Sequence, residues 1–550
     1  MKKNKQTGKF QEVPKQETKQ QDVIEVAPIW TIKRSDVIQS LKNEWYLYVC
    51  LVVLFFGLYF YSFISTGFYQ GEEGAHYINM KKFWTQPSSI LGNWAKTGWK
   101  IIYAIPALEG KTAIYLLNCF FSCLTAFFTY KVVQLRGGVS PILSVFLLFC
   151  GALWFGVSFR IYSEISAACL LMAWIYFHYK KMDFIAAILL SYVLIIRQEM
   201  YIVAAVFGLY LLWNKNYNAF LILGLFPFLN NLWGWIEFGD IMYLYNDAKN
   251  TAAQYSKQYT RAGFDHYFKM SGVCFGYFTV LGIVLYTVFL LAKKRKVDLF
   301  LFAPFYLFFL LDCLFNLKAK EIGTSTAGNL RYMLIIAPMG VALANLAFDQ
   351  LYALTKKYYY LFLFVPMLGL YAYFFTYDHN WIERAFWLPR IYTPLYISIV
   401  FVIFLMLPIK IKWIRDLGFI ALCIVHGLLF IRPIILENRD ENSTCKEIAG
   451  WVLANKYHLQ RPIYQNMAMF NYFMDMTEED YPKGLKFITP QEMEKSPIGS
   501  IVIWDGHFAG KYSGVDYKYF EDRPELYLFL KQWNSPDGKF MFVAYERVNK

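Results

Sequence analysis

The stretch that decides the fold is WYLYVCLVVLFFGLYFYSFIS, residues 45–65, which contains no charged side chain. An α-helix of this length crosses the roughly 30 Å hydrocarbon core of a bilayer. Similar apolar runs recur along the rest of the chain, and short polar connectors separate them. The alternating pattern of barrel strands is absent from these runs, so they predict membrane-spanning helices.

The composition is that of an α-helical polytopic membrane protein. The 550 residues are 57% hydrophobic and only 17% charged, against about 25% charged in an ordinary soluble domain. The formal net charge of +14 would also suit a nucleic-acid-binding protein. However, the basic residues cluster in short connectors at one end of the predicted helices. Membrane topology explains this clustering, and we expect no nucleic-acid partner.

The apolar runs predict about 13 transmembrane helices. Every second connector between them is short and rich in lysine or arginine, as expected on the cytoplasmic side of a membrane. An odd number of spans then places the N-terminus in the cytoplasm and the C-terminal domain outside. The predicted spans lie near residues 45–65, 111–130, 139–157, 163–178, 183–197, 200–213, 218–236, 271–292, 298–317, 331–348, 358–376, 392–408 and 417–434.

The spans divide the chain into three predicted parts. Residues 1–44, rich in lysine and glutamine, form a flexible cytoplasmic tail. Residues 45–434 form the transmembrane domain, which includes the long outer loops 66–110 and 237–270. The first of these loops mixes tryptophans with lysines, a composition that favours amphipathic helices lying along the membrane surface.

Residues 435–550 have a different character from the rest of the chain. A segment with helical spacing is followed by short apolar stretches of strand-like composition. This part predicts a small extracytoplasmic α/β domain. Its strand-like stretches lie within residues 461–474, 495–510 and 539–548.

The first outer loop opens with FYQGEEGAHYINM, residues 68–80. Two adjacent carboxylates flanked by glycines are a poor helix start, so we expect Glu72 and Glu73 to lie in a loop. Adjacent like charges disfavour each other's ionised form, and the glycines allow a ligand to approach the backbone. The pair is therefore a candidate general base. The alternative is that both carboxylates are simply solvated.

The acidic pair resembles the Asp/Glu-Glu pair in the first outer loop of the GT-C superfamily, glycosyltransferases that take sugars from polyprenyl phosphates. Three later segments are similar to motifs of that superfamily and follow in the same order: RIYSEISA (160–167), RQEM (197–200) and GNLRYMLIIAP (328–338). The superfamily pair usually begins with aspartate, whereas this one begins with Glu72, which leaves open which glutamate is the base.

The resemblance implies a GT-C-like architecture and a specific reaction. A hexose, with mannose as the expected sugar, moves from a polyprenyl-phosphate donor to a glycan, lipid or protein acceptor on the extracytoplasmic side, with inversion. Glu72 or Glu73 would take the proton of the acceptor hydroxyl. Arg160, Arg197 and Arg331 would bind the donor phosphate, whose charge grows as it leaves.

Each of the following polar residues has either a functional or a structural role. The arginines could instead anchor helices at the membrane surface, and Glu164 and Glu199 could simply pair with them. Asp312 lies inside an apolar run and is either a functional residue or the partner of Lys318 or Lys320. Candidate substrate contacts, for which a solvated or interfacial position is the alternative, are His76, Tyr77, Tyr162, Tyr332 and His266.

The sequence carries no motif for a cofactor. No His, Cys, Asp or Glu grouping has metal-ligand spacing, and no glycine-rich nucleotide-binding pattern is present, so we expect neither a metal nor a cofactor. The rival function is a transporter or flippase for a lipid-linked saccharide. Such proteins tend to carry internal repeats and charges at mid-membrane depth, and we find no repeat in this sequence. The expected location is a bacterial inner membrane.

Overall fold

The computed structural model describes residues 43–68, 72–92, 94, 96–258, 262–317, 328–353, 393–407, 409–431 and 440–549. The chain divides into two compact units, Met1–Trp45 and Tyr46–Lys550, and the contacts discussed below belong to the second unit. The predicted span 358–376 lies outside the described residues, as does nearly all of the predicted cytoplasmic tail.

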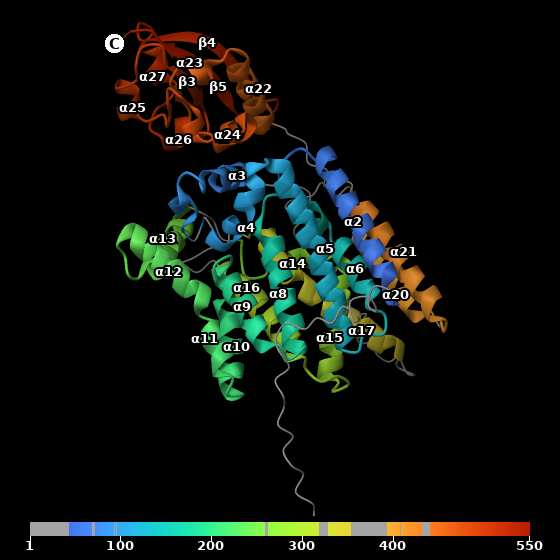
Figure 1. The fold of residues 1–550 in the computed structure, drawn as a ribbon. Helices are drawn as coiled ribbons and strands as arrows, with labels where there is room; N and C mark the ends of the chain where they lie inside the picture. Colours follow the sequence, from blue (N-terminus) through green and yellow to red (C-terminus); the bar gives the residue numbers. More distant parts are fainter. Residues whose placement is uncertain are drawn as a thin grey trace, which may run out of the picture. The chain divides into compact units, whose positions relative to one another are not determined.

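Helices make up the part of the chain that the apolar runs mark out (Figure 1). The opening run forms α2 (Trp45–Ile64). The helices after the first outer loop are α5 (Lys111–Leu135), α6 (Ile142–Phe149), α7 (Ala152–Val157), α8 (Ser163–Tyr179), α9 (Asp183–Leu194), α10 (Tyr201–Trp213), α11 (Tyr217–Ile222), α12 (Leu225–Phe238), α13 (Tyr243–Gln258), α14 (His266–Phe275), α15 (Tyr277–Leu291), α16 (Leu299–Phe315), α17 (Ala337–Ala353), α20 (Thr393–Met406) and α21 (Lys412–Ile431).

Within the described residues, three helical segments are long and apolar enough to cross a membrane. They are α2, α5 and the stretch Tyr217–Phe238, which consists of α11 and α12. A fourth is added if α14 and α15, between which the chain bends by 117°, form one broken span. These segments support an integral membrane protein. The number of thirteen spans stays a prediction, because other predicted spans are shorter or interrupted helices; the run 139–157, for example, forms α6 and α7.

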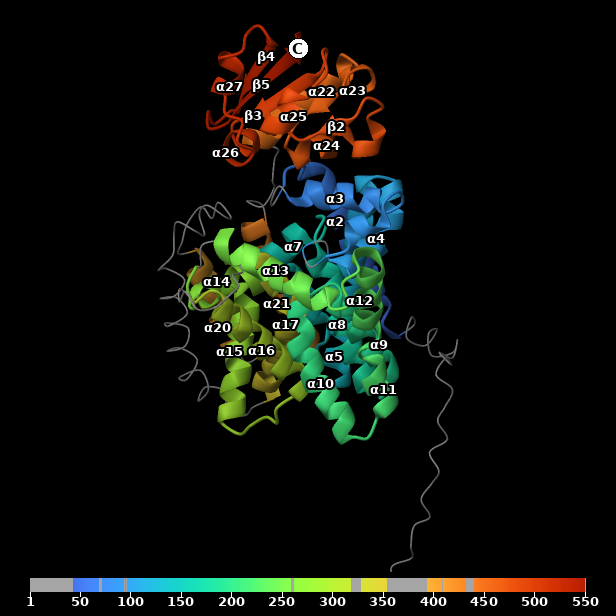
Figure 2. The ribbon, with the colours of Figure 1, turned by 90° about the vertical axis from the view of Figure 1, so that its left-hand side faces the viewer.

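Small residues allow the central helices to approach one another closely. Helices α5, α8, α15 and α17 pack together (Figure 2). A Cβ atom on Gly282 of α15 would lie 2.4 Å from the Cβ of Ala344 in α17, so the two backbones meet at a point where one has no side chain. Close van der Waals packing of this kind drives helix association in lipid, where the hydrophobic effect does not.

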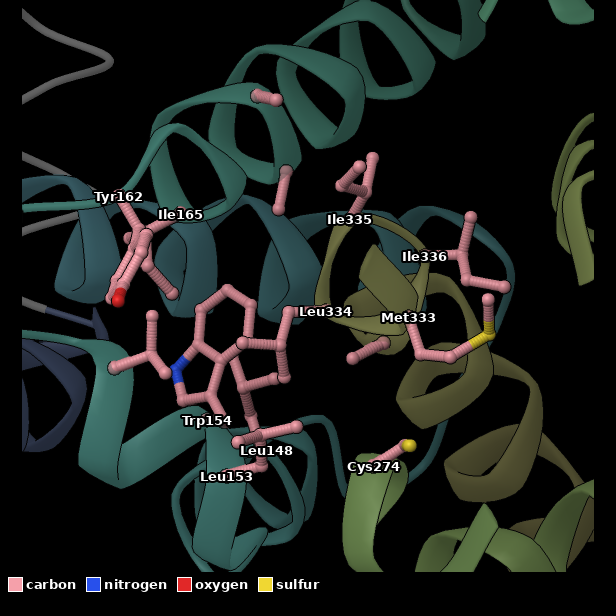
Figure 3. Close-up of a cluster of buried hydrophobic side chains, with 14 of the residues drawn as sticks. Leu148, Leu153, Trp154, Tyr162, Ile165, Cys274, Met333, Leu334, Ile335 and Ile336 are labelled. Atoms are coloured by element: carbon pink, nitrogen blue, oxygen red, sulfur yellow. The ribbon is translucent and has the colours of Figure 1, made fainter. Parts of the chain in front are cut away.

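A buried hydrophobic cluster fixes the short 3₁₀ helix η3 (Leu330–Ile335), which carries Arg331. Figure 3 shows Leu334 of this segment beside Trp154 of α7. Asn329 caps η3, because its side-chain oxygen accepts a hydrogen bond of 3.4 Å from the backbone N–H of Arg331. Packing and cap together hold the start of η3 in one place.

The first outer loop contains three helical segments: α3 (Glu72–Lys82), η1 (Pro87–Ile90) and α4 (Thr97–Leu108). The expectation that the acidic pair is a poor helix start is wrong, since α3 begins at Glu72. Carboxylates in the first turn interact favourably with the exposed N–H groups of a helix N-terminus, and this outweighs the adjoining glycines. Neither α3 nor α4 is long and apolar enough to cross a bilayer.

The C-terminal part contains a five-stranded sheet in the order β2-β1-β3-β5-β4, drawn in orange and red in Figure 1. Strand β1 is parallel to β2 and β3, and β5 is antiparallel to β3 and β4. The central strand β3 is buried along its whole length. The elements are α22 (Asp440–Ala454), α23 (Tyr457–Gln460), β1 (Ile463–Tyr464), α24 (Ala468–Met474), β2 (Leu485–Lys486), α25 (Pro490–Glu494), β3 (Ile501–Asp505), α26 (Phe508–Tyr512), α27 (Lys518–Glu521), β4 (Tyr527–Asn534) and β5 (Met541–Arg547).

Candidate active site

Acidic and basic side chains from separate segments meet in one network. Arg331 of η3 donates from Nη2 to Glu72 at the start of α3, and its Nε lies 3.2 Å from Oε1 of Glu164 in the first turn of α8. The same Glu164 oxygen accepts from Nη2 of Arg197, whose Nη1 lies 3.7 Å from Glu199. Glu164 and Glu199 thus pair with the arginines, which was one of the two roles left open for them.

The side chains of this network differ in how exposed they are. The side chains of Arg197 and Glu164 are 0% and 1% exposed, and that of Arg331 is 4% exposed. The side chain of Glu72 is 27% exposed. Glu164 therefore holds the two guanidinium groups together from inside, whereas Glu72 is accessible to a substrate.

Aromatic rings hold both arginines from one side. The guanidinium carbon of Arg331 lies 4.3 Å from the ring centre of Tyr162, and that of Arg197 lies 4.7 Å from the ring centre of Tyr332. These cation–π contacts stabilise the guanidinium groups without using the N–H donors in the guanidinium plane. Two of the predicted substrate contacts, Tyr162 and Tyr332, thus border the network.

Two lysines that the sequence places among interfacial residues belong to the same site. Lys100 of α4 is buried, and its Nζ lies 5.0 Å from the ring centre of Trp94. Burial and the charge of Lys96 lower the pKa of Lys100 to about 7. Burial and the charge of Arg197 lower the pKa of Lys96 to about 8. No sequence signal singles out this pair, because the first outer loop holds other lysines and tryptophans.

His76 of α3 lies inside the same group of cations. Its ring stacks on Trp94 at 4.7 Å and meets the edge of Trp99 at 5.0 Å. Burial, followed by the charges of Lys100, Arg331, Lys96 and Arg197, lowers the pKa of His76 well below its usual value. The imidazole is therefore neutral at physiological pH.

Several buried donors in this region have no hydrogen-bond acceptor among the described residues. They include Nζ of Lys100, Nε of Arg197 and Nη1 of Arg331. Buried N–H groups without acceptors are unfavourable, and in native proteins they usually mark the place of a ligand, ion or water. An anion with several oxygens, such as a phosphate, matches this set of donors.

Glu73 and Arg160 bind the backbone around the ends of α2 and α8. Glu73 is fully buried and accepts a hydrogen bond of 3.3 Å from the backbone N–H of Ile161. Arg160 donates to the backbone oxygen of Gly67 and, at 2.6 Å, to Oγ of Ser65. These contacts tie α3 and the end of α2 to the start of α8. Glu72 contacts Arg331 of the network, whereas the Glu73 carboxylate binds the backbone before α8.

Two further predicted contacts, His266 and Tyr77, bind other parts of the protein. Nε2 of His266 lies 2.8 Å from the backbone oxygen of Gly328, where the chain enters η3. Gly328 has a φ of +68°, and a Cβ atom there would lie 2.8 Å from the His266 ring, so the turn requires glycine. Tyr77 donates from its hydroxyl to Asp475 of the C-terminal part.

Asp312 is a buried carboxylate in α16. Neither of its oxygens has a hydrogen-bond partner among the described residues, and it interacts electrostatically with Glu199 and Arg197. Its predicted partners Lys318 and Lys320 lie outside the described residues. Across the described part of the chain, no group of three or more His, Cys, Asp or Glu side chains has metal-binding geometry.

No protein-family model and no curated protein sequence matches this chain. Two crystal structures of ArnT from Cupriavidus metallidurans share its fold. The structure bound to undecaprenyl phosphate has a TM-score of 0.57 and 10% sequence identity, over 90% of this chain and 97% of that chain. The apo structure has a TM-score of 0.58 and 10% identity, over 92% of this chain and 98% of that chain. The match shows that this chain has the fold of these two ArnT structures over most of its length.

Proposed function

We propose that this protein is a membrane glycosyltransferase that moves a sugar from a polyprenyl-phosphate carrier to an acceptor hydroxyl. The observation that carries the proposal is the set of buried donors of Lys100, Arg197 and Arg331, which lack acceptors among the described residues and adjoin the Glu72 carboxylate. A phosphate matches the donors, and a carboxylate beside it suits proton transfer. The fold supports this choice, because one ArnT structure holds undecaprenyl phosphate.

On the donor side, Arg331, Arg197, Lys100 and Lys96 would bind the carrier phosphate. Negative charge builds up on this phosphate as its bond to the sugar breaks, and fixed cations stabilise that charge in the transition state. Arginine suits the role because its planar fork can donate two parallel hydrogen bonds to phosphate oxygens. The neutral ring of His76, stacked on Trp94, would border the sugar.

On the acceptor side, Glu72 would act as the general base. The acceptor oxygen forms a bond to the anomeric carbon, while the bond from that carbon to the phosphate oxygen breaks and polyprenyl phosphate leaves. The proton of the acceptor hydroxyl goes to Glu72. Phosphate oxygens would compete with Glu72 for Arg331, which releases the carboxylate for this role. Direct displacement inverts the anomeric configuration.

For the sugar, the acceptor and the side of the membrane, our proposal follows the sequence-based expectations. We propose a hexose, with mannose as the first sugar to test, a glycan, lipid or protein acceptor, and an extracytoplasmic site. Glu73 and Arg160 would support α3 and the start of α8 through the contacts described above. The transporter or flippase alternative is not favoured, because a donor-lined phosphate site beside a partly exposed carboxylate suits group transfer.

Release of free polyprenyl phosphate tests the proposal against a transporter. We expect purified protein in detergent, supplied with a polyprenyl-phosphate hexose and a mixture of lipid and glycan acceptors, to release polyprenyl phosphate in equal amount to the glycosylated acceptor. The measurement is thin-layer or mass-spectrometric analysis of the lipid product. A transporter or flippase breaks no glycosidic bond, so movement of intact donor without any release would overturn the proposal.

Binding of the carrier phosphate is expected to weaken between about pH 7 and pH 9. The pKa values of Lys100 and Lys96, lowered to about 7 and about 8, place both amines in this range. Both are charged below these values and neutral above them, and the anion binds the charged forms. The second pKa of the phosphate monoester is about 6, so the phosphate stays mainly doubly charged over this pH range. The loss cannot exceed about tenfold per pH unit for each lysine.

The measurement is the Kd of polyprenyl phosphate for purified protein at several pH values. Lys100→Met should bind more weakly near neutral pH and show a flatter profile. The matched control is Lys180→Met, which changes an exposed lysine at the end of α8 and should keep the wild-type profile. An unchanged pH profile in Lys100→Met would exclude this lysine from the phosphate site.

A further inference from the structure

Helix α3 presents two opposite faces. Successive residues of an α-helix are about 100° apart, so Glu72 and His76 share one face, whereas Gly74, Tyr77 and Lys81 share the opposite one. The first face meets Arg331 and the tryptophans of the candidate active site. The second face packs against α24 of the C-terminal part.

The contact between α3 and α24 is close enough to require a glycine. A Cβ atom on Gly74 would lie 2.6 Å from Sδ of Met469 and 3.1 Å from Cβ of Tyr472. Both distances are shorter than ordinary van der Waals contact. Any side chain at position 74 would therefore push α24 away from α3, or force Met469 and Tyr472 to move.

Polar contacts fix the same interface along α3. Asp475, which follows α24 in the left-handed conformation with a φ of +57°, accepts a hydrogen bond from the hydroxyl of Tyr77. Nζ of Lys81 lies 2.8 Å from the backbone oxygen of Asp475 and 3.2 Å from its Oδ1. Nζ of the adjoining Lys82 pairs with Glu478 at 2.8 Å.

Tyr472 extends the interface to α5 and to the buried member of the acidic pair. Its hydroxyl lies 2.7 Å from that of Tyr115 in α5, and Nζ of Lys111 lies 4.5 Å from the centre of its ring. Both tyrosines interact electrostatically with Glu73 and Arg160. One residue of the C-terminal part is thereby linked to α5, α3 and the start of α8.

We infer that the C-terminal domain positions the general base, with Tyr472 and Asp475 as positioning residues for Glu72; this rests on the proposed function. Helix α3 has eleven residues, and isolated helices shorter than about 12–15 residues are marginal in water. Its orientation therefore depends on its neighbours. A displacement of about 1 Å at a reacting group can reduce the rate about 100-fold, so loss of the α24 contacts moves Glu72 out of reach of the acceptor hydroxyl.

The test compares Asp475→Ala and Tyr472→Ala with Asp537→Ala, a control that removes an exposed ion pair to Lys539 elsewhere in the same domain. We expect kcat to fall about 100-fold in the first two variants with KM for the donor unchanged, because the phosphate-binding cations stay in place. Hydrogen–deuterium exchange of residues 72–82 should become faster in these variants alone. Asp475→Asn should restore most of kcat, because its amide oxygen still accepts hydrogen bonds and asparagine tolerates the left-handed conformation.

A second pair of variants tests the close contact without removing a polar group. Gly74→Ala should lower kcat and speed exchange of residues 72–82, and adding Met469→Ala should recover much of both, because the smaller side chain makes room for the new methyl group. This recovery separates displacement of α3 from general misfolding.

Two results would overturn the inference. Normal kcat in Asp475→Ala and Tyr472→Ala, despite faster exchange in α3, would show that the contact does not position the base. A raised KM for the acceptor with unchanged kcat would show that the domain binds acceptor instead. If the wild-type protein releases no polyprenyl phosphate, the proposed function fails and this inference fails with it; an active wild type with unaffected variants refutes the inference alone.

Discussion

Replacing Glu72 with glutamine is expected to lower the transfer rate by about 10²–10⁴-fold, the usual contribution of a general base. The amide keeps the size of the side chain but cannot accept the proton of the acceptor hydroxyl. Binding of the carrier phosphate should persist or tighten, because the substitution removes a carboxylate that competes for Arg331. Single-turnover release of polyprenyl phosphate measures the rate, and a separate binding assay measures the affinity.

The matched control for this experiment is Glu109→Gln, which changes an exposed glutamate at the end of α4. This variant should transfer at the wild-type rate. Glu73→Gln should act on folding instead, because Glu73 is fully buried and accepts from the backbone of Ile161. A Glu72→Gln enzyme with full transfer activity would remove Glu72 from the role of base.

Replacing Arg331 with alanine is expected to have the second large effect. Its side chain pairs with Glu72 and Glu164 while 4% exposed, and breaking a buried pair costs about 3–5 kcal/mol of stability. Loss of one cation at the leaving phosphate should also lower kcat by about 10²–10³-fold. Arg331→Lys should recover only part of the lost stability and kcat. A guanidinium can donate to both glutamates and a phosphate in one plane, whereas a single ammonium cannot.

Donor titrations and thermal unfolding of the purified variants measure these effects. Arg523→Ala is the matched control, because the Arg523 guanidinium stacks on Tyr519 and donates to its backbone oxygen within the C-terminal domain. It should bind polyprenyl phosphate normally. Unchanged carrier binding in Arg331→Ala would contradict the phosphate site proposed above.

The helices could be predicted from the sequence better than their interruptions. Long apolar runs identify α2 and α5, because burial in hydrocarbon needs continuous apolar composition. The breaks at Gly151 and Gly276 could not be predicted, since glycine is also common inside membrane helices. In the structure the two breaks meet: a Cβ atom on Gly276 would lie 3.3 Å from Cα of Gly151. Such a break depends on a partner distant in sequence.

The C-terminal sheet shows the same limit. Strands β3 and β5 are apolar because they lie inside the sheet, and the sequence identifies both. The sequence pattern does not predict strand β4, because β4 is an edge strand. It is buried mainly at Tyr527 and Trp533 and exposed at most positions between them. An edge strand needs little apolar patterning, since only one neighbour and one face constrain it.

The candidate active site could be predicted only in part. Glu72, Arg197 and Arg331 could be selected because they lie in segments that resemble motifs of a known superfamily, and the structure brings them together. Lys96 and Lys100 could not be selected in this way. Both lie in a segment that mixes lysine and tryptophan, where composition indicates a membrane surface and does not reveal which amine is buried.

The interface between α3 and α24 joins residues almost 400 positions apart in the chain. Gly74 of α3 leaves the space that Met469 and Tyr472 of α24 occupy. The two helix surfaces are therefore complementary in shape. Hybrid proteins assembled from two homologues should therefore exchange α3 together with the C-terminal domain. A junction placed only near residue 435 would separate α3 from the α24 surface that fits it.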